Sequence, residues 1–126
     1  MTQQFVSAHQ ELQVYTMGFE LAMRIWEVAA RFPETEREIL TREILGSSRL
    51  VCVKVARAWQ RRRFYEAFVA GMNEAEARSA ETQTWIEFAV MCGHLDAETG
   101  QELFQQYNVV MAGLRRLIDN ADAWTF

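Results

Sequence analysis

The sequence predicts an all-α protein, an antiparallel up-down-up-down four-helix bundle that forms one domain over residues 1–126. Apolar residues recur every three or four positions along most of the chain, which is the period of a helix with one buried face. One proline and six glycines among 126 residues are too few for the many turns of an all-β fold. Because 50% of the residues are hydrophobic and 24% are charged, the chain has enough apolar side chains for a packed core.

The first helix is expected over residues 8–30. Ser7 can cap its amino terminus, and Gln10, three positions later, completes a capping-box pattern. The side chains expected to face the core share one side of the helix and are Leu12, Tyr15, Phe19, Ala22, Met23, Trp26, Ala29 and Ala30.

The second helix is expected over residues 36–60, after a break at Pro33. Proline disfavours helical dihedral angles in the residue before it, and Thr35 with Glu38 forms a second capping-box pattern. The predicted apolar positions are Ile39, Leu40, Ile44, Leu45, Leu50, Val51, Cys52, Val53, Val55, Ala58 and Trp59. The core of one bundle covers only one face of a helix, so this broad apolar surface indicates a contact with another subunit.

Two polar breaks define the remaining helices, which are expected over residues 64–92 and 97–120. The first break is the run 60–63; in the second, Gly93 suits the left-handed conformation that ends a helix, and Asp96 suits the next amino-terminal cap. The residues predicted to face inward are Phe64, Phe68, Met72, Ala75, Trp85, Phe88 and Cys92 in the third helix, and Leu103, Phe104, Tyr107, Met111, Leu114, Leu117 and Ile118 in the fourth. The tail beyond residue 120 is expected to be less ordered.

Each predicted helix also contains a glycine, which lowers its helix propensity by about 1 kcal/mol relative to alanine. A close approach between helices would offset this cost, whereas an exposed glycine is simply tolerated. The four glycines are Gly18, Gly46, Gly71 and Gly113.

No combination of residues predicts catalysis, a cofactor, a bound metal or a small-molecule substrate. A carboxylate-bridged di-iron bundle needs Glu-x-x-His pairs, and neither His9 nor His94 has a glutamate at that spacing. Cys92 lies two positions before His94 but lacks the further cysteine or histidine pair of a zinc site. Cys52 and Cys92 lie in apolar segments, which predicts buried free thiols, while a disulfide between them stays open. We therefore expect a protein without enzyme activity.

The sequence also predicts a cytoplasmic protein. The amino-terminal residues lack the basic segment and apolar stretch of a signal peptide. Purely apolar stretches such as 88–92 are far shorter than the roughly 20 residues that a membrane span needs.

Charge is distributed unevenly along the chain, although the net charge is only −4. Residues 44–63 contain no acidic residue, whereas residues 64–102 contain eight acidic residues and one arginine. The candidate binding residues of the basic segment are Arg49, Lys54, Arg57, Arg61, Arg62 and Arg63. Such a cluster can contact nucleic-acid phosphates. The alternative is structural: these arginines pair with glutamates of neighbouring helices or subunits, for example Arg57, Arg61 and Arg62 with Glu66.

Several short motifs resemble the 23S rRNA intervening-sequence protein family, also called the S23 or four-helix bundle protein family. They include the run 32–36 (Phe-Pro-Glu-Thr-Glu), the run 40–43 (Leu-Thr-Arg-Glu) and the loop 92–95 (Cys-Gly-His-Leu). The resemblance covers about residues 12–120. This chain departs from the family pattern at 56–58, where Ala-Arg-Ala replaces Ala-Glu-Gly, and at Lys54, which replaces an asparagine.

The resemblance implies a homopentameric barrel of four-helix bundles. It also implies partners, because the family includes the accessory variability protein of diversity-generating retroelements, which binds nucleic acid and the reverse transcriptase. We therefore predict a non-enzymatic oligomeric interaction protein that binds RNA, DNA or a reverse transcriptase through its basic segment. The alternative is a purely structural homo-oligomer whose arginines hold the subunits together.

Overall fold

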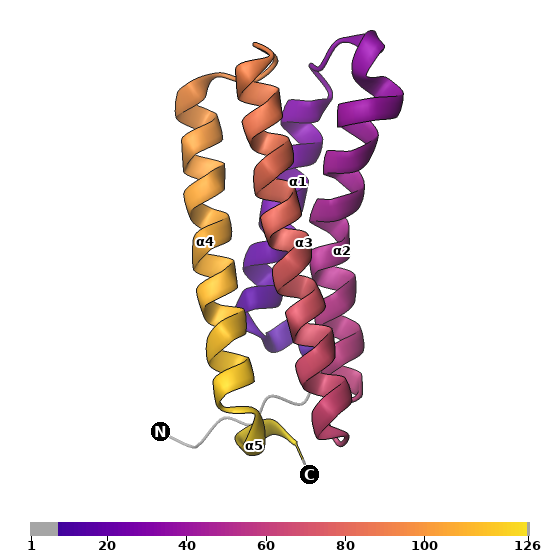
Figure 1. Ribbon diagram of the computed structural model, residues 1–126, viewed down its shortest axis with the longest axis vertical. Coiled ribbons are helices and arrows are strands. Elements are labelled where there is room, and N and C mark those ends of the chain that lie inside the picture. Colours follow the sequence, from indigo (N-terminus) through magenta and orange to yellow (C-terminus); the bar gives the residue numbers. More distant parts are fainter. Residues whose placement is uncertain (1–7, 126) are drawn as a thin grey trace.

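The computed structural model describes residues 8–125, and within this range four long helices lie side by side (Figure 1). The long helices are α1 (Gln13–Ala29), α2 (Arg42–Gln60), α3 (Tyr65–Met91) and α4 (Ala97–Asp119). Each runs opposite to the one before it, and α1 also contacts α4, which closes the bundle. The predicted helical bundle is confirmed, and residues 8–125 contain no strand. None of the helices in this range combines the length and apolarity that a membrane crossing requires.

Short helical elements occupy the ends and the first connection. They are η1 (His9–Glu11), η2 (Glu34–Glu36), η3 (Arg37–Thr41) and α5 (Ala121–Trp124). The first long helix begins at Gln13 rather than at residue 8, because Leu12 is extended after η1. The predicted cap at Ser7 lies outside the described residues. The tail that we expected to be less ordered instead forms α5, in which Ala121 is buried.

The helix-end signals at Gly93 and Asp96 are confirmed, whereas the capping box predicted from Thr35 and Glu38 is wrong. Gly93 has a positive φ of 78°, the left-handed conformation that favours glycine. The Asp96 carboxylate caps α4 by accepting a hydrogen bond of 2.9 Å from the Thr99 backbone nitrogen. Thr35 makes no capping hydrogen bond, because the chain there passes through the tight 3-10 turn of η2 and the wider π-helical turn of η3. The α-helix α2 therefore begins at Arg42 rather than at residue 36.

A continuous apolar core runs along the bundle. Its largest fully buried side chains are Trp59, Tyr107, Phe68, Ile25, Ile44, Met72, Ile86, Leu103 and Leu114. They come from all four long helices. One end of the core is closed by α5, because Trp124 packs against Trp59 with ring centroids 5.6 Å apart.

Several apolar side chains that were predicted to face the core are exposed instead. Phe19, Met23 and Trp26 are each about half exposed on α1. The buried side of α1 lies about one residue further round the helix and contains Val14, Gly18, Leu21, Ala22, Ile25 and Ala29. Both sets of residues satisfy the helical spacing, so only packing decides between them. The same correction applies to Ala30, Phe64, Phe88 and Cys92, all of which are exposed.

Gly71 lies at a close approach between α2 and α3. A Cβ atom at this position would lie 2.6 Å from the Cβ atom of Ala58, far inside van der Waals contact. A Cβ atom at Gly113 would similarly meet Val14, whereas one at Gly46 would meet no side chain and no other helix within 4 Å. The close-approach interpretation therefore holds for two of these glycines, and Gly46 is an exposed glycine in a helix.

We expect Gly71→Ala to lower the free energy of unfolding by about 1–3 kcal/mol, because the added methyl group must push α2 and α3 apart. Gly46→Ala is the matched control and should raise it by up to about 1 kcal/mol, since it gains helix propensity without a clash. Urea unfolding of both variants measures the difference. Equal effects in the two variants would show that helix contact at Gly71 does not limit stability.

Candidate functional site

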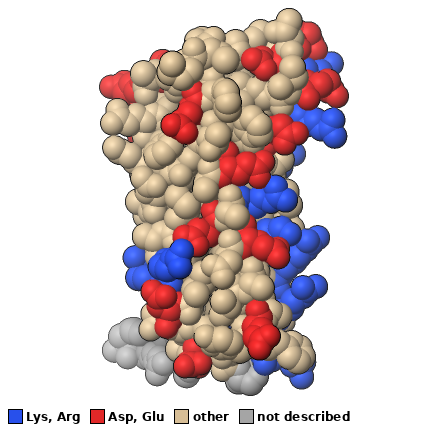
Figure 2. All heavy atoms as spheres, in the orientation of Figure 1, with Lys and Arg blue, Asp and Glu red and all other residues tan. Residues whose placement is uncertain are grey.

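The six basic residues predicted from the sequence lie on α2 and in the turn that follows it. Lys and Arg side chains gather along the edge of the bundle formed by α2, and acidic side chains run beside them over α3 (Figure 2). Arg49, Arg57, Arg61 and Arg63 are exposed, and Lys54 and Arg62 are partly buried. The helix therefore presents a basic edge, which we define as these six residues.

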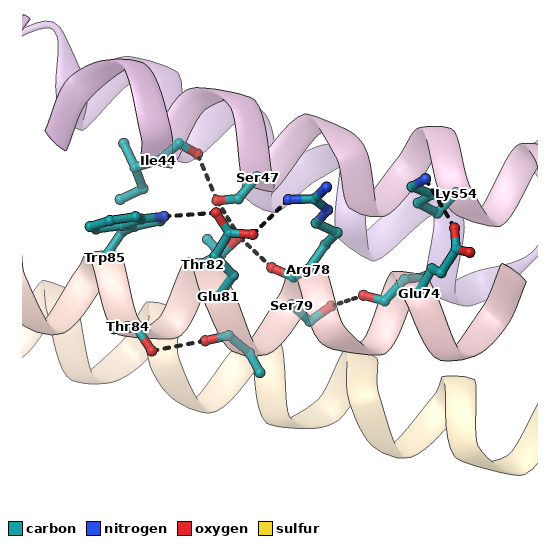
Figure 3. Close-up of polar contacts among 12 residues, drawn as sticks. Ile44, Ser47, Lys54, Glu74, Arg78, Ser79, Glu81, Thr82, Thr84 and Trp85 are labelled. Carbon is teal, nitrogen blue, oxygen red and sulfur yellow. Dashed lines mark hydrogen bonds and ion pairs between the residues drawn. The ribbon is translucent and has the colours of Figure 1, made fainter. Parts of the chain in front are cut away.

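Lys54 is the member of the basic edge that pairs with α3. Its ammonium group lies 2.9 Å from a carboxylate oxygen of Glu74 (Figure 3). The hydrogen bond and charge of Lys54 lower the pKa of the Glu74 carboxyl. Neither Arg57 nor Arg61 pairs with Glu66 in the described part of the chain, so the suggested ion pairs do not form within one chain. Pairing between subunits stays a prediction.

Arg62 and Arg63 lie against aromatic rings at the end of α2. The Arg62 guanidinium is 4.5 Å from the centre of the Trp59 ring and donates a 2.9 Å hydrogen bond to the Trp59 carbonyl oxygen. The Arg63 guanidinium is 5.5 Å from the centre of the Phe64 ring. These contacts fix Arg62 in particular, so part of its role is to cover the buried indole.

The remaining arginines border two different depressions. Arg57 and Arg61 lie along a hollow of about 210 Å³ between α2 and α3, beside the small residues Ala67, Ala70 and Gly71. Arg57 also borders an apolar groove of about 440 Å³ between α1 and α2, and Arg49 lies along the same groove. The other residues that line this groove, which we call the α1–α2 groove, are Tyr15, Phe19, Ala22, Met23, Cys52, Val53 and Ala56.

A second apolar groove of about 430 Å³ lies between α3 and α4. The residues that line this α3–α4 groove are Ile86, Glu87, Val90, Met91, Ala97, Gly100, Gln101, Phe104, Gln105 and Asn108. Met91 at its edge is 84% exposed. Because the helices contact one another in the cyclic order α1, α2, α3, α4, the two grooves lie on opposite sides of the bundle.

A layer of buried polar side chains was not predicted from the sequence. The Thr82 hydroxyl of α3 lies 2.9 Å from the Ser47 hydroxyl of α2 and 2.8 Å from the Arg78 carbonyl oxygen (Figure 3). The Gln83 amide donates to the Phe104 carbonyl oxygen of α4 at 2.9 Å. These hydrogen bonds satisfy polar groups that would otherwise destabilise the core. Polar residues such as Ser47 and Thr82, which recur at the helical spacing of the buried positions, could have indicated this layer from the sequence.

The two cysteines differ from each other, and neither forms a disulfide. Cys52 is buried as predicted, and desolvation raises its pKa to about 11, so its thiol stays protonated at neutral pH. Burial likewise raises the pKa of the Tyr107 hydroxyl. Cys92 is exposed, which contradicts the predicted burial. It lies near His94 and Glu36 at the end of the bundle away from Arg61, and these three side chains could hold a metal ion.

The fold and surface define a helical-bundle protein whose candidate interaction residues lie on its outside. The chain belongs to the 23S rRNA-intervening sequence protein family, whose profile matches residues 10–116. This confirms the family resemblance described from the sequence.

Comparison with solved structures supports the same fold. A crystal structure of a protein with unknown function from the S23 ribosomal protein family of Bacteroides thetaiotaomicron superposes with a TM-score of 0.75. The match covers 84% of this chain and 95% of that chain at 19% sequence identity. No curated protein matches the chain.

Proposed function

We propose that this chain is a non-enzymatic interaction protein that assembles with copies of itself and binds nucleic-acid phosphates through its basic edge. The observation that carries the proposal is the state of Arg49, Arg57, Arg61 and Arg63. All four are exposed, and none forms an ion pair with a carboxylate of residues 8–125. An unpaired guanidinium can donate two hydrogen bonds to one phosphate, and several together give salt-dependent binding.

The two apolar grooves support self-association. Phe19 and Met23 line the first groove, Met91 lines the second, and each is about half exposed or more. They leave apolar surfaces on opposite sides of the bundle. Two different patches on opposite sides favour a head-to-tail contact, which closes into a ring when the rotation between subunits permits. We propose a homopentameric ring, the assembly that the family resemblance implies. A ring would repeat the basic edge and increase its affinity for a long polyanion.

The position of each arginine suggests a division of roles. Arg49 and Arg57 flank the α1–α2 groove, which specifically favours the second candidate role, a contact between subunits. Arg61 and Arg63 lie beyond this groove at the end of α2 and stay accessible in such a ring. We propose that this end of the basic edge contacts phosphate. Binding to a reverse transcriptase stays a prediction from the family resemblance.

The test measures fluorescence anisotropy of labelled RNA and duplex DNA over a range of salt concentrations. We expect Arg61→Gln with Arg63→Gln to weaken binding roughly 10- to 30-fold near 0.1 M salt and to reduce the salt slope by about 1–2, because two phosphate contacts are lost. Arg62 is left unchanged because it packs on Trp59.

The matched control is Arg37→Gln with Arg42→Gln, which removes the same charge from the start of η3 and the start of α2. These arginines already pair with Glu34 and Glu38, so this variant should bind almost as tightly as the parent protein. An equal loss in both double variants would indicate nonspecific attraction. If the parent protein binds neither probe at low salt, the phosphate-binding proposal fails, and the structural role of the arginines is favoured.

A further inference from the structure

Three side chains with metal-binding atoms meet at the end of the bundle opposite Arg61. Glu36 comes from η2, Cys92 ends α3, and His94 lies in the turn before α4. Their ligand atoms all lie within 4.8 Å of one another. The geometry points to a Zn²⁺ site formed by the Glu36 carboxylate, the Cys92 thiolate and the His94 imidazole.

The chemistry of these ligands selects the metal. A thiolate and an imidazole together favour Zn²⁺ over Mg²⁺ or Ca²⁺, which prefer oxygen ligands only. Tetrahedral coordination with ordinary zinc bond lengths separates the ligand atoms by roughly 3.3–3.6 Å. His94 Nε2 and Glu36 Oε2 are already 3.0 Å apart. The remaining adjustment falls on Cys92, whose exposed side chain can rotate towards the other two.

The backbone holds Cys92 and His94 in one turn. Gly93 adopts its left-handed conformation between them, and its backbone nitrogen donates to the Val90 carbonyl oxygen at 3.0 Å. The backbone nitrogen of His94 donates to the Ala89 carbonyl oxygen at 2.9 Å. Because these hydrogen bonds exist without the ion, the two ligands need little ordering when they bind it.

The third ligand is held from the other side of the site. Glu36 donates its backbone N–H to the Pro33 carbonyl oxygen at 2.9 Å, which forms the η2 turn. Phe32 packs beside the His94 ring, with ring centroids 6.0 Å apart. The Glu36 and His94 side chains are only 19% and 18% exposed. This partial burial strengthens the attraction between an ion and its ligands relative to open water.

A Zn²⁺ ion at this position would join the α1–α2 connection to the α3–α4 connection. These connections are 58 residues apart in sequence, so the ion would close a long loop of the chain. Binding would release the Cys92 thiol proton to solvent, because the thiolate is the ligand. Three protein ligands leave a fourth position for water, the arrangement of an open zinc site.

Titration of the reduced protein with Co²⁺ and Zn²⁺ tests the proposal. Co²⁺ bound by a cysteine gives a thiolate-to-metal charge-transfer absorption, which reports on Cys92 directly. We expect one ion per chain, and we expect Cys92→Ser, His94→Ala and Glu36→Gln each to reduce the affinity at least about 100-fold. Loss of a hydrogen-bond partner of a metal ligand reduces metal affinity about 10- to 100-fold, and loss of a direct ligand should cost at least as much. Zn²⁺ at about 100 times its Kd should raise the Tm by roughly 10 °C.

Two variants are matched controls. Cys52→Ala removes the buried cysteine and should leave the charge-transfer band unchanged. Glu34→Gln removes a carboxylate from the same turn that pairs with Arg37 instead, and it should bind Zn²⁺ like the parent protein. A parent protein without the charge-transfer band, or metal binding that survives Cys92→Ser, overturns the proposal. In either case Glu36 and His94 form only a hydrogen bond that joins the two connections.

Discussion

Trp59→Ala is expected to lower the free energy of unfolding by about 3–5 kcal/mol, a large share of the total stability of a small domain. Trp59 is 1% exposed, so its removal leaves a cavity that the surrounding helices cannot fill. Its ring contacts Phe68 at a centroid distance of 6.2 Å, Trp124 at 5.6 Å and the Arg62 guanidinium at 4.5 Å. The substitution therefore loosens the end of α2, the start of α3 and α5 together. Urea unfolding measures the change.

Trp59→Phe is the control for this substitution. It keeps an aromatic ring in the cluster and removes the indole N–H, which is buried without a hydrogen-bond partner among residues 8–125. Because an unsatisfied buried donor is itself destabilising, its removal offsets part of the lost packing. We expect a loss below about 1.5 kcal/mol. A loss below 1 kcal/mol for Trp59→Ala would contradict the packing role assigned to this ring.

Phe19→Glu combined with Met23→Glu is expected to abolish self-association. These side chains line the α1–α2 groove and are 50% and 48% exposed, and burying a carboxylate at the same positions in an interface is strongly unfavourable. Light scattering should show the parent protein at about five times the 14.7 kDa mass of one chain and the variant at the mass of one chain. Circular dichroism checks that the variant stays helical.

Phe64→Glu with Tyr65→Glu is the control, because these exposed residues line neither groove, and it should keep the parent mass. A mixing experiment then tests the head-to-tail contact. Met91→Glu blocks the α3–α4 groove, so this variant and the Phe19→Glu, Met23→Glu variant each keep one intact side. Mixed together, they should form a particle of two chains. A parent protein that stays monomeric at high concentration would contradict the ring.

The boundaries of the helices were largely predictable because their signals are local. Pro33 ends the first helical segment, and Gly93 with Asp96 separates the last two helices as predicted. The first helix begins five residues later than predicted, and the final residues form α5. In both places the chain lies at the end of the bundle, where contacts with distant residues such as Trp59 decide the backbone conformation.

The candidate site was predictable as a basic segment and not as a set of contacts. The uneven charge of residues 44–63 identified α2 as the basic edge. It could not show that Lys54 pairs with Glu74 or that Arg62 covers Trp59. The Lys54 partner depends on which side of α2 faces α3, and these two helices pack closely at Gly71. The Arg62 contact forms where α2 ends and the chain turns towards α3.

The sequence by itself determined the helical class, the number of long helices, the family resemblance and the basic edge. These properties follow from the spacing of apolar and charged residues and from the residues that begin or end helices, and both signals act over a few residues. Only the tertiary structure decided which side of each helix faces the core, and it alone brought Glu36 to Cys92 and His94. The reason is physical: helical spacing admits more than one apolar face, and a contact across 58 residues exists only when the helices between them have packed.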